Sequence, residues 1–323
     1  MSTEPARRTL VVVNEHAGGG AMADIFRRTE HHLIDLLGSI EVAFTDGEGH
    51  AIGIVREGLR QGFGRVIVGG GDGTLNECVN GFFDEDGAPI APDAELALLS
   101  GGTGGDFRKT LGIRSTEDAM AALAGGRVIP VDVGKVSFTG KQGPTHRHFL
   151  NIASFGLSGL VDQNIGAWRR MGGAVAYFGA TLKSMWGWKN PKVQLTLDGE
   201  TMAPRPIITV AVGNGRYFGG GMKICPDARL DSGVFEITVL GDLSRLELIM
   251  LSRSIYDGAH VYNPKVTVRR AKVVVATPEP GRDVHLDIDG EPLGTLPARF
   301  ELLPRALRLV VSPLASASGR LSP

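Results

Sequence analysis

Glycine clusters that directly follow short apolar runs constrain the fold of this chain more than any other feature. The run Leu10–Val13 is followed by Gly18–Gly20, Arg65–Val68 by Gly69–Gly71, and Glu95–Leu99 by the glycines between Ser100 and Asp106. Runs of this length are typical of strands buried on both faces of a parallel sheet. Clustered glycine permits sharp turns and close approach of backbone to a ligand. Because ligands bind at the carboxyl ends of such strands, we expect the clusters to converge on one crevice.

The elements between these runs predict two domains. Helical segments near 21–37, 49–61, 74–82 and 115–124 alternate with the apolar runs, which indicates an α/β domain with a parallel sheet over residues 1–134. Strand patterns dominate residues 135–301, beginning with one over Gly134–Phe138 and including one over His148–Ser154, and predict a mainly antiparallel β-sandwich. Residues 302–314 contain a further strand, Ala306–Val311, as a candidate return to the first domain. The small and polar tail 315–323 is expected to be disordered.

Charge and cysteine content exclude several classes of function. The net charge is −1, so no basic field is present for binding nucleic acid. The two cysteines, Cys78 and Cys225, lie far apart in the sequence and fit a reducing cytoplasm better than a disulfide framework. No apolar run reaches the roughly 18 residues of a spanning helix, so any membrane contact is expected to be peripheral. The histidines lack a second cluster of ligands at metal-binding spacing.

The segment Gly69–Glu77 carries the strongest local signal. It reads Gly-Gly-Gly-Asp-Gly-Thr-Leu-Asn-Glu and lies between a predicted strand and a predicted helix. Backbone amides of such a turn and the helix N-terminus can hold a polyphosphate. Asp72 would repel phosphate unless a divalent cation lay between them, which favours a Mg²⁺–nucleotide complex. The alternative is a turn in which Asp72 only caps the helix. The segment is neither a Walker A sequence nor a dinucleotide fingerprint.

Further motifs follow in a defined order along the chain. They are Asn14–Gly19, Gly70–Gly81, Gly102–Phe107, Phe149–Gly156, Asn214–Met222, Pro226–Gly233 and Asp287–Glu291. This series resembles the diacylglycerol kinase catalytic family, in its branch of soluble bacterial lipid kinases, which is also similar to sphingosine and ceramide kinases. The resemblance covers about Leu10 to Val311, and its specificity lies in the order of the motifs.

The resemblance implies an NAD kinase/diacylglycerol kinase-like fold and an ATP- and Mg²⁺-dependent lipid kinase, with diacylglycerol as the default acceptor and ceramide or another sphingoid lipid as the rival. By match to the family's motifs, the phosphates or their Mg²⁺ would be contacted by Asn14, Gly70, Gly71, Asp72, Gly73, Thr74, Asn76, Gly102, Thr103 and Gly104. Asp289 would accept the proton of the lipid hydroxyl, with Glu291 as its orienting partner or a metal ligand, and Asp72 would act beside them. Without the resemblance, Asp289-Gly290-Glu291 is an exposed hairpin turn.

The sequence also departs from the family's pattern. Asp231 falls where the family often holds a structural Mg²⁺, but one of two successive acids is replaced by Ser232, so a solvated turn is the alternative. Glu15 replaces a proline in the first motif, and Gly105 replaces an amide in the third. Asp106 or Arg108 is a candidate substitute for that amide.

The segment Trp168–Lys189 contains all three tryptophans, interleaved with arginine and lysine. Aromatic residues with a cationic rim suit a helix in the headgroup region of a membrane. The resemblance therefore places the protein in the cytoplasm, peripherally bound to the inner face of the membrane. A core helix packed on the sheet is the alternative. The sequence leaves oligomerisation open.

Two other functions remain possible from the sequence. One is a soluble-substrate kinase of the NAD kinase type, which shares the Gly-Gly-Asp-Gly turn. The other is a nucleotide- or lipid-binding protein without catalysis, which the departures at Glu15 and Gly105 keep open.

Overall fold

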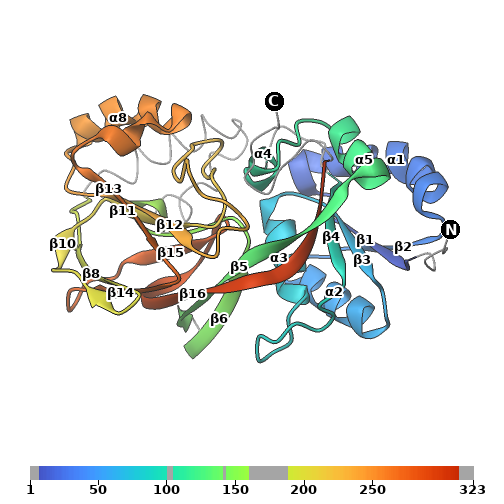
Figure 1. Ribbon diagram of the computed structural model, residues 1–323, viewed down its shortest axis with the longest axis horizontal. Coiled ribbons are helices and arrows are strands. Elements are labelled where there is room, and N and C mark those ends of the chain that lie inside the picture. Colours follow the sequence, from blue (N-terminus) through green and yellow to red (C-terminus); the bar gives the residue numbers. More distant parts are fainter. Residues whose placement is uncertain (1–6, 100–104, 141–142, 160–187, 313–323) are drawn as a thin grey trace. The chain divides into compact units, whose positions relative to one another are not determined.

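The computed structural model describes residues 7–99, 105–140, 143–159 and 188–312 (Figure 1). The chain divides into two compact units. One comprises the residues up to Asp132 together with those from Pro304 onward, and the other is Val133–Leu303. The chain passes between the units within β5 (Arg127–Gly140) and β16 (Glu291–Val311).

The first unit is built on a parallel sheet. Its strand order is β2 (Ile40–Phe44), β1 (Thr9–Val13), β3 (Arg65–Gly69), β4 (Glu95–Leu99) and the end of β16. In register, Val13 lies opposite Gly69 and Gly69 lies opposite Leu99, so β1, β3 and β4 end at one level. The order reverses direction between β1 and β3, which is where open α/β sheets bind ligands. The parallel sheet expected from the sequence is confirmed.

Helices cover both faces of this sheet. Figure 1 shows α1 (Ala21–Leu37) and α5 (Thr116–Gly125) on one face and α2 (His50–Arg60) and α3 (Asp72–Gly81) on the other. Side chains alternate along a strand, so each buried strand supplies both cores. The core beneath α1 and α5 contains Val11, Val13, Met22, Ile25, Phe26, Leu33, Ile67, Ala97, Leu99, Leu123 and Val310. A 3-10 turn, η1 (Ala17–Gly20), and a short helix, α4 (Phe107–Thr110), follow β1 and β4.

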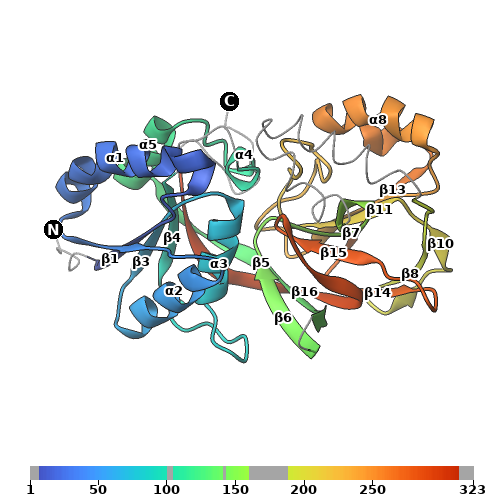
Figure 2. The same ribbon diagram turned by 180° about the vertical axis from the view of Figure 1, so that it is seen from behind.

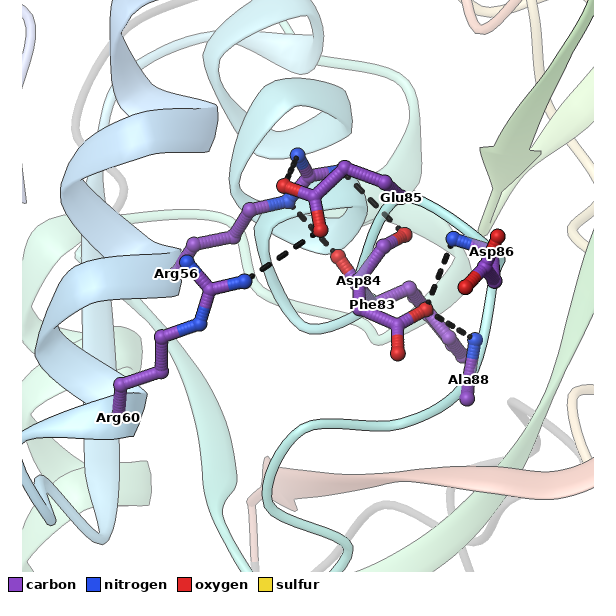
Figure 3. Close-up of polar contacts among 7 residues, drawn as sticks. All are labelled: Arg56, Arg60, Phe83, Asp84, Glu85, Asp86 and Ala88. Atoms are coloured by element: carbon purple, nitrogen blue, oxygen red, sulfur yellow. Dashed lines mark hydrogen bonds and ion pairs between the residues drawn. The ribbon is translucent and has the colours of Figure 1, made fainter.

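Polar contacts fix the connection between α3 and β4 (Figure 3). Arg56 of α2 donates to the carbonyl oxygen of Phe83 at 2.8 Å and to Oε1 of Glu85 at 2.8 Å. The carboxylate of Asp84 accepts the Ala88 amide at 2.8 Å, and this bond holds the pKa of Asp84 below its ordinary value. These contacts anchor the connection to α2.

The second unit is an antiparallel β-sandwich, as the sequence predicted. One run of strands has the order β13 (Val266–Ala271), β12 (Phe235–Leu240), β11 (Thr209–Gly213), β7 (Ile152–Gly156), β15 (His285–Ile288) and β16. The remaining strands are β5, β6 (Gly143–Phe149), β8 (Lys192–Leu197), β9 (Glu200–Thr201), β10 (Arg205–Pro206) and β14 (Val273–Pro278). Stacked phenylalanines fill the core, with ring centroids 5.6 Å apart in Phe149–Phe235 and 5.9 Å apart in Phe155–Phe300.

A helix closes the outer face of this unit. α8 (Arg245–Asp257) buries Leu248, Leu251 and Ile255 in a second apolar cluster, and η4 (Ala259–Tyr262) follows it. Trp188 packs against the same cluster. The structure thus supports the core alternative for this one tryptophan, whereas residues 160–187 of the tryptophan-rich segment lie outside the described residues.

Three predicted strands differ from the structure. The single strand over His148–Ser154 is wrong, because Leu150 and Asn151 interrupt it between β6 and β7. The strand predicted within 134–138 is the middle of β5, and the one over Ala306–Val311 is the end of β16, which pairs in parallel with β4 at Arg308. The predicted tail also lies outside the described residues. None of the helices in the described part of the chain combines the length and apolarity needed to cross a membrane.

Candidate functional site

Side chains from two segments meet where β1 and β3 end. Asn14 follows β1, and its Nδ2 donates to Oγ1 of Thr74 at 3.0 Å, in the first turn of α3. A Cβ built on Gly70 would lie 2.5 Å from that of Thr74, whereas one on Gly71 would meet nothing within 4 Å. The turn therefore passes closely beneath the helix at Gly70 and is open toward solvent at Gly71. The predicted phosphate-binding residues of these two motifs lie together.

Asp72 ties this turn to the segment that follows β4. It is the first residue of α3 and Gly71 is the N-cap, so Asp72 does not occupy the capping position considered from the sequence. Its Oδ2 accepts the amide of Asp106 at 2.6 Å, and its Oδ1 accepts the amide of Phe107 at 3.3 Å. Three consecutive strand ends of the sheet are thus connected through Asn14, Thr74 and Asp72. Gly102, Thr103 and Gly104 lie outside the described residues.

The departures in the third motif have a structural account. Gly105 has φ +98°, a conformation that side chains rarely adopt, so the backbone favours glycine here. Arg108 donates to the carbonyl oxygen of Arg114 at 2.8 Å, and Lys109 pairs with Asp106 at 2.7 Å. These two cations are therefore engaged with their own loop.

Two polar residues of α3 have hydrogen-bond partners outside the turn. The Asn76 side chain is buried and accepts from Nδ2 of Asn80 at 3.2 Å. The carboxylate of Glu77 accepts the amides of Gly49 at 2.7 Å and Ala51 at 3.1 Å, and so holds the N-terminus of α2. This role of Glu77 could not be predicted from the sequence, because its partners lie 26 and 28 residues earlier and no local pattern marks them.

This edge of the sheet fits a Mg²⁺–nucleotide. The first amides of an α-helix have no acceptor within the helix and favour an anion such as phosphate, and α3 begins here with open space at Gly71. Carboxylate and amide oxygens, as in Asp72 and Asn14, are ligands that Mg²⁺ prefers. The helix amides suit the phosphates of such a ligand, and the side-chain oxygens suit its Mg²⁺.

In the second unit, Asp289 is held by the break between β6 and β7. Its Oδ1 accepts the amides of Asn151 at 3.1 Å and Ile152 at 2.9 Å, and its Oδ2 accepts that of Leu150 at 3.1 Å. Asp289 has φ +51° and its own amide donates to the carbonyl oxygen of Ile152 at 2.9 Å. Three amide donors stabilise the ionised carboxylate. The predicted strand is interrupted because these amides bind Asp289 and leave the sheet's ladder.

The same break gathers the other motifs of this unit. Asn214 donates to the carbonyl oxygen of Leu150, and Asn151 donates to that of Tyr217, both at 2.8 Å. Glu291 is half-buried at the start of β16, in the turn that Asp289 begins. Asp289 and Glu291 are thus neighbours on a turn that is anchored in the unit, and the exposed hairpin considered from the sequence does not describe Asp289.

The predicted metal position at Asp231 lies on a turn with bonds of its own. Asp231 pairs with Nε of Arg229 at 3.2 Å. The hydroxyl of Ser232 lies 3.1 Å from the carbonyl oxygen of Arg229 and 2.7 Å from that of Val234. Within the described ranges, no three or more His, Cys, Asp or Glu residues are grouped to hold a metal. A metal ion at Asp231 stays a prediction, and the turn resembles the solvated alternative.

Glu236 lies beside this turn and was not singled out from the sequence. It is 2% exposed, and neither carboxylate oxygen has a hydrogen-bond partner in the described structure. Burial, followed by the charge of Asp227, raises the pKa of Glu236 to about 7, although the backbone of Asp227 and the cations Arg270 and Arg216 act in the opposite direction. Side chains alternate between the two faces of a strand such as β12, so the sequence of the strand alone does not mark Glu236 as a buried acid.

Replacing Glu236 by Gln is expected to stabilise the protein above pH 7. The pKa is raised from 4.5 to about 7, so the native state favours the protonated form. This contribution to stability is fully present below pH 4.5 and is lost as the pH rises through about 7. The total loss of stability is about 3 kcal/mol. Urea unfolding across this range should give a flatter pH dependence for Glu236→Gln. The exposed Glu200→Gln is the control, and equal slopes for both variants would contradict the assignment.

Comparisons with known proteins agree with these two units. Residues 8–136 match the diacylglycerol kinase catalytic domain, and residues 151–311 match the YegS C-terminal NAD kinase beta sandwich-like domain. The second match has the NAD kinase type of sandwich in its name, whereas the sequence suggested that class from the Gly-Gly-Asp-Gly turn of the first unit.

Whole-length relatives give the same result. A "Probable lipid kinase YegS-like" of Pseudomonas aeruginosa (strain UCBPP-PA14) is 30% identical over 84% of this chain and 83% of its own length. A diacylglycerol kinase of Bacillus subtilis is 28% identical over 94% of this chain and 96% of its own. The crystal structure of a candidate diacylglycerol kinase from Bacillus anthracis is 27% identical, with a TM-score of 0.77 over 98% of this chain and 99% of that one. The chain therefore belongs to the diacylglycerol kinase and YegS-like family of lipid kinases.

Proposed function

We propose that this chain transfers the γ-phosphoryl group of ATP to the hydroxyl of a membrane lipid, with diacylglycerol as the first acceptor. The observation that carries the proposal is the linkage of three strand ends through Asn14, Thr74 and Asp72 at the position where α/β sheets bind ligands. The relatives described above are named as diacylglycerol or lipid kinases, which favours diacylglycerol over ceramide or another sphingoid lipid.

The first unit would bind the nucleotide. Amides of the turn Gly70–Thr74 would hold the phosphates, and Asp72 and Asn14 would hold Mg²⁺, with Gly102–Gly104 as further contacts by their motif. When bound, Mg²⁺ neutralises charge on the phosphates, and phosphoryl transfer depends mainly on such alignment and neutralisation. Asn76 is buried against Asn80, so we assign it to the packing of α3 and not to the nucleotide.

The second unit would supply the groups that handle the acceptor. The sequence assigned the proton of the lipid hydroxyl to Asp289. Three amide bonds favour a positioning role for this carboxylate, which fixes the turn 289–291. We therefore assign proton acceptance to Glu291, on the same turn and more exposed. A proton acceptor in this reaction needs only to orient the hydroxyl and take its proton late.

A pocket in the second unit is our candidate for binding part of the lipid acceptor. Its volume is about 370 Å³, within the usual size of ligand pockets. The apolar side chains of its lining are Leu157, Trp188, Ile208, Leu243 and Leu248, and polar side chains supply the rest. Such a mixed lining suits an amphipathic acceptor such as diacylglycerol, and the lipid kinase relatives favour a lipid over NAD. We place the activity at the inner face of the membrane, with the protein peripherally bound.

The test is Mg²⁺-dependent transfer of labelled phosphate from ATP to acceptors in mixed micelles. The panel holds diacylglycerol, ceramide, sphingosine and phosphatidylglycerol, with NAD as the soluble control. We expect labelled phosphatidic acid from diacylglycerol. Labelled ceramide phosphate would identify ceramide as the acceptor in place of diacylglycerol. Labelled NAD alone would overturn the lipid proposal. ATP binding without any labelled product would favour the catalytically silent alternative.

A further inference from the structure

Exposed apolar side chains gather on one helix of the second unit. Leu246, Ile249, Met250 and Tyr256 of α8 are 65%, 44%, 64% and 42% exposed, and Tyr262 of η4 is 87% exposed. The other large apolar residues with comparable exposure in the described ranges are Ile34, Leu36 and Phe44 of the first unit. Among the described residues of its unit, α8 thus carries most of the exposed large apolar side chains.

These side chains form a continuous stripe along α8. Residues at positions 246, 249, 250, 253 and 256 lie on one side of an α-helix, because its repeat is 3.6 residues. The opposite side carries Leu248, Leu251 and Ile255, which are buried in the core. A surface helix of a soluble domain usually turns a polar face outward. α8 instead is apolar on both sides, and Figure 2 shows it on the outside of its unit.

The helix is fixed independently of any partner. Ser244 and Glu247 form a capping box, in which Oγ of Ser244 accepts the Glu247 amide at 3.3 Å and Oε2 of Glu247 accepts the Ser244 amide at 2.8 Å. Lys265 also binds Oε1 of Glu247 at 2.7 Å. The stripe is therefore presented by a preformed helix, so little order has to be gained on docking.

The charges around the stripe are complementary to an anionic surface. Arg253 lies within the stripe and is exposed, and Lys223 lies beside the last turn, where its amide donates to the carbonyl oxygen of Ile255 at 2.9 Å. Neither cation has an ion pair in the described part of the chain. Among the acids nearby, Glu247 pairs with Lys265, whereas Asp257 accepts the Ala259 amide at 2.8 Å and keeps its charge, so Arg253 and Lys223 leave one net positive charge beside the stripe. Cations beside an apolar stripe are typical of helices that lie on anionic membranes.

A second copy of the chain fits this stripe less well than a lipid surface does. In a twofold dimer the centre of the contact meets its own counterpart. Arg253 is near the middle of the stripe, so two guanidinium groups would approach each other in an apolar contact. At a lipid interface the same side chain can extend to phosphate, while Tyr256 and Tyr262 place rings and hydroxyls at the headgroup level.

We propose that the exposed face of α8, defined by Leu246, Ile249, Met250, Arg253 and Tyr256, docks the protein on an anionic lipid bilayer. This inference rests on the proposed function, because a lipid acceptor gives the enzyme a reason to remain at a bilayer. The pocket described above is lined in part by Ser244, Glu247 and Leu248 at the N-terminal end of the same helix, so the docking face and the pocket share one element.

The test measures binding to vesicles without ATP or diacylglycerol, so it is independent of the kinase assay. The full chain is sedimented with phosphatidylcholine vesicles that contain a minority of phosphatidylglycerol. We expect the double variant Leu246→Ser with Met250→Ser to bind these vesicles at least about tenfold more weakly than the parent. The matched control is Ile34→Ser with Leu36→Ser, which removes exposed apolar residues of the first unit and should bind like the parent. We expect Arg253→Gln to lose about fivefold on anionic vesicles only.

A fluorescent label on a single cysteine tests membrane contact without depending on whether the Leu246/Met250 double variant folds. Both native cysteines are buried, so a dye reacts selectively with Met250→Cys or, as the control, with Leu36→Cys. An emission shift at position 250 and none at position 36 on adding vesicles is the expected result. A parent that stays unbound, or equal emission at both positions, overturns the proposal. So does a lipid-free dimer that the Leu246/Met250 double variant dissociates, which would assign the stripe to a second copy.

Discussion

Replacing Asp72 by Asn is expected to lower kcat for phosphoryl transfer by about two to three orders of magnitude. The carboxylate accepts the amides of Asp106 and Phe107 and is also our ligand for Mg²⁺. Asn keeps one acceptor oxygen, but its amide group would face a backbone donor and carries no negative charge. The turn after β3 and the segment after β4 would separate, and the cation would lose its anionic ligand. Initial rates at saturating diacylglycerol and varied ATP measure both kcat and the KM for ATP.

Asp118→Asn is the matched control for this change. The Asp118 carboxylate also accepts two amides, those of Arg114 at 2.7 Å and Ser115 at 3.1 Å, but at the N-terminus of α5. We expect this control to cost about 1 kcal/mol of stability and to leave kcat unchanged. An Asp72→Asn enzyme that keeps kcat within a few-fold of the parent would move the nucleotide site away from this turn. Equal losses of activity in both variants would assign the effect to stability alone.

The parallel sheet was predictable because its strands are short, apolar and followed by glycine. Strands such as β1 and β3 are buried on both faces, so their residues are apolar at consecutive positions and the run is visible in the sequence. Convergence of the motifs also follows, since parallel strands end at a common edge. The partners of Asp72 did not follow, because they lie 34 and 35 residues later and are backbone amides, which any residue supplies.

Other features are invisible to local patterns for related reasons. The break between β6 and β7 exists because Asp289, 137 residues beyond Ile152, takes the amides that a strand would use. The full extent of β16 was missed because prolines at 292, 297 and 304 usually end a strand, whereas here β16 continues past them. The exposed stripe of α8 could not be predicted, because an apolar residue looks the same in sequence on a buried and on an exposed face.

Replacing Asp289 by Asn is expected to cost about 2–4 kcal/mol of stability and most of the activity. Asn tolerates the left-handed backbone, which has φ +51° at this position, so the variant changes the charge and leaves the turn's conformation available. Three buried amides, those of Leu150, Asn151 and Ile152, would then share one acceptor oxygen. Thermal unfolding and initial rates on diacylglycerol measure the two losses.

Glu291→Gln separates positioning from proton transfer on the same turn. Glu291 is half-buried and is not bonded to the three amides that hold Asp289, so its replacement should leave the melting temperature near that of the parent. Its activity should nevertheless fall by about 10²- to 10³-fold, because the proton acceptor is gone. The opposite pattern, a stable Asp289→Asn protein without activity beside an active Glu291→Gln enzyme, would return proton acceptance to Asp289. Since Asp289 holds the turn that carries Glu291, the double variant should be no less active than the weaker of the two single variants.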